Sequence, residues 1–278
     1  MMRRRLPAIA LMLAAFLVAA PAAAWKNGPP NNKVTNTLAD CASPPYSTHD
    51  WIADQALGQL PEDEWRWLAP HRRLYLIGTE APDYDHIHPA CGTPNSGYND
   101  TRKGRHDLRW SDDFSRVSYD NPARRAQEEY DKAVTAYGAG RPGDAAYFLG
   151  AAAHYIGDLA QYGHNIKGER HHADYEDWVG AMTPNADAGP FAPFLLARPP
   201  MPRGAHEAVV ETGRIVARGN GGILPPADMD RLFETRDQIS AVYLESVSRS
   251  LNVSVNELAS VLHKFYRDVI AGNEANRP

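Results

Sequence analysis

Hydrophobic residues recur at helical spacing along most of this chain. Residues 47–60 begin with a Ser/Thr pair suited to capping a helix and then carry Trp51, Ile52 and Leu57 on one face. The same spacing predicts further helices over residues 62–78, 121–138, 142–162, 173–182, 205–218, 226–250 and 254–271. Strand-like alternation is almost absent, so the pattern predicts an all-α, single-domain helical bundle.

The first hydrophobic run belongs to a different kind of segment. Arginines occupy positions 3–5, an apolar run covers 6–20, and an Ala-x-Ala site ends at Ala24, which together are typical of an export signal. The run is shorter than the roughly 20 residues that a membrane-spanning helix needs. We therefore expect residues 1–24 to be cleaved, leaving residues 25–278 as one secreted or periplasmic domain with no integral membrane segment.

Charge argues against one class of partner. The formal net charge is −5, and it becomes −8 once the three arginines of the signal are removed. Proteins that bind duplex nucleic acid usually carry a basic surface. The composition therefore predicts no duplex nucleic-acid partner.

The two cysteines, Cys41 and Cys91, both lie in predicted loops of the exported part. In an oxidising compartment they favour one disulfide that joins these loops. Free thiols and metal ligation are the alternatives.

Metal-ligand chemistry begins in the most apolar predicted helix. His154 and Asp158 are four residues apart, so they share one helical face. A surface hydrogen-bonded pair is the alternative to a metal site, but the neighbouring residues are small or apolar, and burying these groups without a strong partner is costly. Nitrogen and oxygen ligands suit zinc, which would satisfy both side chains.

A second pair with the same spacing follows at His172 and Glu176, and His164 lies between the pairs. For His171 we expect an exposed or supporting position, because its neighbour His172 has the carboxylate one turn later. The concentration of imidazoles and carboxylates in this short window predicts a metal centre.

These residues carry a resemblance to a known family. The pattern His154-Tyr-Ile-Gly-Asp158, continued through His164 to His172 and Glu176, resembles the zinc-dependent bacterial phospholipase C family and, more distantly, is similar to the single-strand-specific zinc nucleases. In both groups the mature chain begins with a tryptophan whose free amine and carbonyl oxygen chelate one of three zinc ions. The resemblance thus implies that Trp25 becomes a zinc ligand when the Ala24–Trp25 bond is cut.

The same resemblance assigns the remaining ligands. The family's early histidine matches His49, its aspartate matches Asp83 in Pro82-Asp83-Tyr84, and its next histidine best matches His106. His86 and His88 compete for the last role, but they lie too near Asp83 for the family spacing.

The implied fold is a bundle with a trinuclear zinc site in a cleft between helices. One zinc would be held by His154, His106 and Asp158, with Asp83 as a further candidate, a second by Trp25, His49 and Asp158, and a third by His164, His172 and Glu176. Asp83 is either a ligand or the catalytic base that orients the attacking water. Zinc would activate this water and withdraw charge from a phosphodiester.

The resemblance implies a phospholipase C-like hydrolase that acts on phospholipid at a membrane surface, and we expect a monomer. The alternatives are a nuclease or nucleotidase with the same metal centre, and a zinc-binding protein without activity. Tyr84 is the expected head-group contact. Residues 101–105 are basic and no glutamate follows Trp25 closely, which disfavours choline; these basic residues either select an anionic head group or form a solvated loop.

Overall fold

The computed structural model describes residues 41, 46–235 and 240–272, and within them the chain is almost entirely helical. The α-helices are α2 (Thr48–Leu57), α3 (Glu62–Trp65), α4 (Arg72–Glu80), α5 (Asn121–Gly138), α6 (Pro142–Asp158), α7 (His172–Gly180), α8 (Ala205–Arg218), α9 (Pro226–Glu234) and α10 (Ala241–Phe265). Short helical turns are η1 (Ala69–His71), η2 (Pro89–Cys91), η3 (Thr101–Lys103), η4 (Tyr162–Asn165), η5 (Gly189–Phe194) and η7 (Tyr266–Ala271). The predicted all-α class is confirmed.

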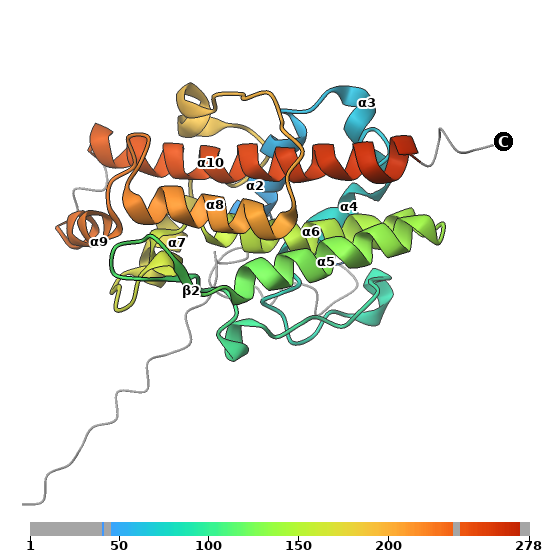
Figure 1. Ribbon diagram of the computed structural model, residues 1–278, viewed down its shortest axis with the longest axis horizontal. Coiled ribbons are helices and arrows are strands. Elements are labelled where there is room, and N and C mark those ends of the chain that lie inside the picture. The colour runs from blue at the N-terminus through green and yellow to red at the C-terminus, as the bar shows by residue number, and fades with distance from the viewer. Residues whose placement is uncertain (1–40, 42–45, 236–239, 273–278) are drawn as a thin grey trace, which may run out of the picture.

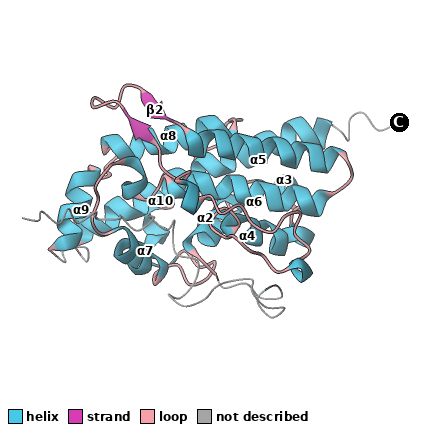
Figure 2. Cartoon of the chain, turned by 90° about the horizontal axis from the view of Figure 1, so that it is seen from below, coloured by secondary structure: helices cyan, strands magenta, loops and turns pink. Residues whose placement is uncertain are grey.

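Helix α6 is the centre of the bundle. Nearly all of its residues from Ala145 to Asp158 are buried, as expected for a helix that is apolar on every side. Helices α4 and α5 pack along it, and α2, α8 and α10 also contact it. Figure 1 shows α8 and α10 side by side across one face, and Figure 2 shows α2, α4, α5 and α6 from below.

Two glycines allow α4 and α6 to approach closely. A Cβ atom added at Gly78 would overlap the carbonyl oxygen of Tyr147, and one added at Gly150 would overlap that of Tyr75. Only glycine permits backbones to come this near. The close approach matters for the metal centre, because the carbonyl oxygen of Thr79, next to Gly78, meets His154 of α6.

The N-terminus of α2 has the predicted cap. The Ser47 hydroxyl accepts the backbone N–H of Asp50 at 3.2 Å, and the Asp50 carboxylate accepts the N–H of Ser47 at 3.0 Å. This reciprocal capping box fixes the first helical turn. His49 therefore has a defined position within that turn.

Several helix boundaries differ from those predicted. The segment 62–78 is divided into α3, η1 and α4, because Pro70 cannot supply a helical N–H. The helix predicted over 142–162 ends at Asp158, and the Gln161 side chain accepts the N–H of Gly163 at the start of η4. A two-stranded antiparallel ribbon, β1 (Arg109–Trp110) and β2 (Val117–Tyr119), is too short to give a sequence pattern.

The C-terminal helices were also divided at the wrong place. The predicted helix 226–250 includes two helices, because α9 ends at Glu234 and α10 begins at Ala241. Helix α10 then continues through the break that was predicted near residues 251–253. The polar residues Ser250 and Ser254 face α6 in this region. The Ser254 hydroxyl donates to the carbonyl of Ile156 at 3.1 Å, so polarity here marks a helix contact rather than a loop.

The predicted disulfide between Cys41 and Cys91 is present. It is buried, and Arg73 donates to the carbonyl oxygens of both cysteines, at 2.9 Å and 3.2 Å. No helix of the described ranges has the length and apolar character needed to cross a membrane. The predicted signal, residues 1–24, and Trp25 lie outside the described residues.

Candidate metal centre

Eight of the predicted ligands converge into three groups that could each hold a metal ion, and the first two groups share His154. These groups are His49, His154 and Asp158; Asp83, His106 and His154; and His164, His172 and Glu176. Within each group, one ligand atom from every residue lies within 4.8 Å of the others. We call the first two groups together the five-residue cluster and the last group the three-residue cluster.

Asp158 lies at the middle of the five-residue cluster. Its Oδ1 is 3.4 Å from His49 Nε2, and its Oδ2 is 2.7 Å from His106 Nδ1 and 3.3 Å from His154 Nε2. Oδ1 is also 3.8 Å from His164 Nε2 in the three-residue cluster. The two carboxylate oxygens thus face different histidines, which is the arrangement a bridging ligand requires.

His49 reaches the cluster across a glycine of α6. A Cβ atom at Gly157 would lie 2.8 Å from His49 Nδ1, so any larger residue there would displace the imidazole. The ring stacks on that of His154 with centroids 4.0 Å apart. The His-Tyr-Ile-Gly-Asp sequence therefore supplies both ligands and the space for a third.

Two of the histidines are oriented by their second ring nitrogen. His154 Nδ1 is 2.6 Å from the carbonyl oxygen of Thr79, and His164 Nδ1 is 3.1 Å from a carboxylate oxygen of Asp107. Because both acceptors require a proton on Nδ1, the Nε2 atoms are left to face the clusters. Such partners fix the tautomer and ring orientation of metal-binding histidines.

Asp83 and His106 come from irregular segments that lie close together. His106 Nε2 is 3.5 Å from Asp83 Oδ1, and His154 Nε2 is 3.8 Å from the same oxygen. The Thr101 hydroxyl donates to Asp83 Oδ1 at 2.5 Å. The Asp83 side chain is 12% exposed, whereas the Asp158 side chain is fully buried, so Asp83 lies on the solvent side of the cluster.

The three-residue cluster is built where η4 meets α7. His172 Nε2 is 2.8 Å from Glu176 Oε1, one helical turn away. The His164 and His172 rings meet edge to face, with centroids 4.7 Å apart. His172 Nδ1 is 2.5 Å from Glu169, which holds the ring from the other side.

Burial shifts the protonation of most of these groups. It lowers the pKa of His49 to about 4, that of His154 well below its usual value, and that of His164 as well. Burial alone would raise the pKa of Asp158, but the neighbouring His154, His106 and His164 hold it below its usual value. An ionised Asp158 carboxylate therefore stands beside the neutral imidazoles of His49, His154 and His164, which is the ligand state that zinc requires.

Two histidines behave differently. Burial alone would lower the pKa of His106, but the charge of Asp158 outweighs it and raises the pKa to about 9. Glu176 and Glu169 likewise raise the pKa of His172 to about 10 against its burial. Burial raises the pKa of Glu176 to about 7. In the metal-free protein these two histidines hold protons that a metal ion must displace.

The buried polar atoms fit a bound metal. Within the described part of the chain, both ring nitrogens of His49, Nε2 of His164 and Oδ1 of Asp158 are buried and make no hydrogen bond. Such atoms are costly to bury without a partner. Zinc in proteins is bound by imidazole nitrogens and carboxylate oxygens, so the residues present fit zinc.

The other candidates lie outside the clusters. His171 is half-buried against the ring of Phe233, with centroids 5.6 Å apart. His86 is exposed, and His88 accepts the backbone N–H of Ala90. Of the three candidates for the ligand between Asp83 and His154, His106 is the one that joins a cluster. The Tyr84 hydroxyl donates to Glu80 at 3.3 Å.

Sequence reasoning missed the supporting residues Thr79, Thr101, Asp107 and Glu169. Asp107 follows His106 directly and Glu169 is three residues before His172. An acidic residue this close to a candidate histidine could have been identified from the sequence as a possible hydrogen-bond partner. Thr79 acts through its backbone carbonyl, which every residue has, so its residue type does not indicate this role. Its role depends on the close approach of α4 to α6.

Residues 48–188, just over half of the chain, match the family model described as zinc dependent phospholipase C. The chain belongs to this family. The match includes every predicted ligand from His49 to Glu176. The match confirms the resemblance to this family that the sequence motifs indicated.

Two solved structures are similar to this chain. The alpha-toxin of Clostridium perfringens from avian strain SWCP has 17% sequence identity and a TM-score of 0.50, covering 81% of this chain and 64% of that one. The alpha-toxin of Clostridium absonum has 18% identity and a TM-score of 0.47, covering 80% and 63%. The chain spans less than two thirds of the length of both, and the first likeness supports the helical fold. No curated protein matches significantly.

Proposed function

We propose that the chain is a secreted, monomeric zinc phosphodiesterase that hydrolyses the head-group phosphodiester of phospholipids. The observation that carries this proposal is the pair of buried clusters joined through Asp158, in a chain of the zinc-dependent phospholipase C family. The orphaned nitrogen and oxygen atoms of the clusters support metal binding independently of the family.

The proposed centre contains three zinc ions and nine residues. His154, His106 and Asp158 would hold the first ion with Asp83 beside it, Trp25, His49 and Asp158 would hold the second, and His164, His172 and Glu176 the third. His164, His172 and Glu176 form a group of their own, which supports the third ion, and the described ligands of the other two ions share the five-residue cluster. Trp25 lies outside the described residues, so its part rests on the resemblance and on the chemistry of a free amine and its own carbonyl oxygen.

Bound zinc supplies Lewis acidity: it lowers the pKa of a bound water and withdraws charge from the phosphate. The protein keeps the ligands ready for this task. Asp158 stays ionised and faces histidines with both oxygens. Thr79 and Asp107 hold the protons on the outer nitrogens of His154 and His164.

We assign Asp83 the role of the base that orients water at the phosphodiester. It is more exposed than Asp158, and the Thr101 hydroxyl fixes one of its oxygens. Asp83→Asn should then lower kcat while the zinc content stays near that of the unaltered protein. A lost zinc ion would instead make Asp83 primarily a ligand.

The deciding experiment is hydrolysis of a panel of phosphatidylcholine, phosphatidylethanolamine, phosphatidylglycerol and single-stranded DNA by the mature chain, with phosphorus products identified. We expect diacylglycerol and phosphorylated head groups from lipid. Cleavage of DNA alone would favour the nuclease function, and no hydrolysis by a zinc-loaded chain would leave a binding protein. Metal analysis of the same sample should find close to three zinc ions.

A further inference from the structure

The five-residue cluster takes two ligands from segments that lack regular secondary structure, and an irregular segment joins the ligands of the three-residue cluster. Asp83 and His106 lie outside α-helices, and the segment between His164 and His172 is also irregular. Such segments have no helical hydrogen bonds to hold them in place. A metal site needs its ligands fixed closely, so other contacts must hold these segments.

Asp100 holds the segments that carry Asp83 and His106. It is 1% exposed, and its backbone N–H donates to the carbonyl of Pro82 at 2.8 Å, next to Asp83. Its Oδ2 accepts Arg125 Nε of α5 at 2.8 Å and the Tyr155 hydroxyl of α6 at 2.7 Å. The Asp100 carbonyl oxygen accepts the N–H of Arg105, next to His106, at 3.2 Å. Asp100 thereby ties both ligand segments to the two long helices.

The basic run before His106 is partly used for the same purpose. Lys103 Nζ and Arg105 both lie 3.3 Å from Asp100 Oδ1. These two cations therefore point to a buried carboxylate of the protein itself. They are poor candidates for selecting an anionic head group, which favours a structural role for this part of the loop.

Asp230 of α9 holds the three-residue cluster in a similar way. It is 7% exposed, and its Oδ1 accepts the backbone N–H of Arg170 at 3.0 Å, two residues before His172. The Tyr162 hydroxyl, two residues before His164, donates to the same oxygen at 3.3 Å. Arg170 also donates to Asp230 and, with both terminal nitrogens, to Glu234 of α9.

We infer that Asp100 and Asp230 are positioning residues, each holding the ligand segments of one cluster: Asp100 the five-residue cluster and Asp230 the three-residue cluster. The inference rests on the metal binding in the proposed function. Neither residue belongs to the groups that could hold an ion. Each acts through main-chain and side-chain hydrogen bonds to segments that carry the ligands.

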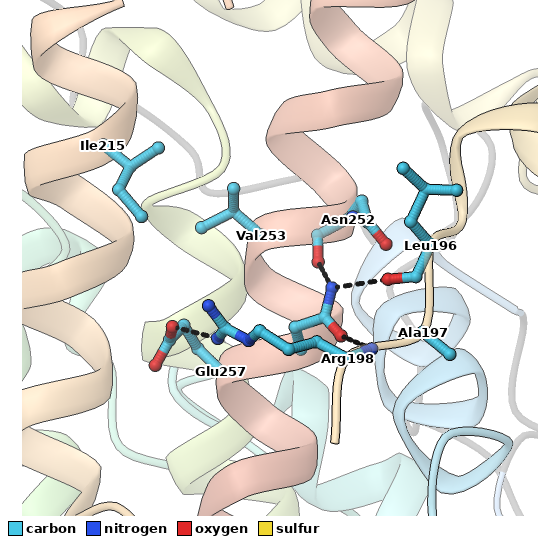
Figure 3. Close-up of a pocket in the computed structure, with 8 residues that line it drawn as sticks. Leu196, Ala197, Arg198, Ile215, Asn252, Val253 and Glu257 are labelled. Carbon is cyan, nitrogen blue, oxygen red and sulfur yellow. Dashed lines mark hydrogen bonds and ion pairs between the residues drawn. The ribbon is translucent and has the colours of Figure 1, made fainter. Parts of the chain in front are cut away.

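A third buried carboxylate provides a matched control. Glu257 of α10 is 1% exposed, and it pairs with Arg198 at 2.6 Å and Arg203 at 3.1 Å. It lines a pocket of about 270 Å³ with Asn252, Asn256 and Leu196, and no candidate ligand lines that pocket (Figure 3). Glu257→Gln thus loosens a buried ion pair without touching either cluster.

The test measures zinc affinity one cluster at a time in the mature full-length chain. His172→Ala removes the three-residue cluster. The double variant His49→Ala/His106→Ala takes one ligand from each of the two ions proposed for the five-residue cluster, so each background reports the other cluster. Asp100→Asn, Asp230→Asn and Glu257→Gln are added to each background. Zinc affinity is measured by competition with a chromophoric chelator, and cobalt absorption spectra report ligand geometry.

We expect a crossed pattern. Asp100→Asn should weaken zinc binding to the five-residue cluster by about 10–100-fold, the range for supporting residues of metal sites, and leave the other cluster unchanged. Asp230→Asn should do the reverse, and Glu257→Gln should affect neither. An equal loss at both clusters, or no loss, would overturn the inference.

Milder variants cover the possibility that an aspartate substitution prevents folding. Tyr155→Phe removes one hydrogen bond from Asp100, and Arg170→Gln removes side-chain contacts to Asp230. They should give the same crossed pattern with smaller changes in affinity, and uncrossed changes would contradict the inference. If the unaltered chain binds no zinc, the proposed function fails. That result differs from a loss of zinc affinity at both clusters, which would contradict only the inference about Asp100 and Asp230.

Discussion

At the scale of single residues, the centre depends on pairing buried imidazoles with one ionised carboxylate. Asp158 lies within 3.4 Å of ring nitrogens from His49, His106 and His154. Burying a charged group is costly unless it is paired, so this arrangement is expected only if a strong ligand compensates for it. Removing a member therefore harms metal binding more than it harms the hydrophobic core.

Substitution of the α6 pair should abolish most activity. His154→Ala or Asp158→Asn is expected to lower kcat/KM by at least about a hundredfold and to release zinc, because direct ligands matter more than supporting residues. His171→Ala is the control, since His171 packs on Phe233 outside both clusters. Zinc content and lipid hydrolysis are measured together, and unchanged zinc in the α6 variants would exclude them as ligands.

Protonation predicts how zinc affinity varies with pH. His106 and His172 have pKa values raised to about 9 and about 10, so in the metal-free protein they hold protons throughout the neutral range. Zinc must displace these protons, and its affinity should therefore increase from pH 6 to pH 9. Titration calorimetry in two buffers of different ionisation enthalpy measures the proton release. An affinity independent of pH over this range would contradict the assigned ligands.

At the scale of elements, the spacing of α4 and α6 determines the orientation of His154. Gly78 and Gly150 let the two backbones approach, which brings the Thr79 carbonyl within 2.6 Å of His154 Nδ1. The hydrogen bond is thus a consequence of helix packing. It could not be derived from the residues around either partner.

Gly150→Ala should therefore damage both stability and metal binding. A Cβ atom there overlaps the Tyr75 carbonyl, and overpacking of this kind typically costs about 1–3 kcal/mol. Gly138→Ala is the matched control at the end of α5, where a Cβ atom meets nothing within 4 Å. Urea unfolding and zinc content give the two readouts. Equal behaviour of the variants would show that the close approach is not required.

Helix prediction succeeded where one apolar face sufficed and failed where context decided. The boundaries of α5 and α8 agree with the prediction, because their apolar faces are bounded by proline or glycine. The break expected near residues 251–253 was wrong, because α10 uses serine hydroxyls to contact α6. A polar residue that faces a neighbouring helix cannot be distinguished from one in a loop by sequence pattern alone.

At the scale of the whole molecule, the proposed centre requires the processed chain. The cut after Ala24 would create the free amine of Trp25, and the Cys41–Cys91 disulfide ties the chain that follows Trp25 to the body of the protein. Processing would then complete the metal centre after export.

An N-terminal extension tests this dependence. A mature chain with one alanine added before Trp25 should lose most of its activity and one zinc ion, because the amine would then belong to the alanine. A matched control replaces Lys26 with alanine and keeps Trp25 first, and it should retain its zinc. Full activity of the extended chain would remove Trp25 from the ligand set.

The sequence by itself determined the helical class, and it predicted the disulfide partners and part of the proposed metal centre. Four-residue separation places His154 beside Asp158 and His172 beside Glu176 whatever the rest of the fold. The resemblance supplied His49, Asp83 and His106. Their convergence on Asp158, from α2, the segment after α4 and the loop after η3, was decided only by the tertiary structure.

The supporting contacts were likewise decided only by packing. Asp100 meets Arg125 and Tyr155, and Asp230 meets Arg170 and Tyr162, over separations of 25 to 68 residues. Nothing in the local sequence distinguishes these aspartates from solvated ones. Ligand identity is local chemistry and can be read from the chain, whereas ligand position depends on contacts between distant segments that only the folded bundle brings together.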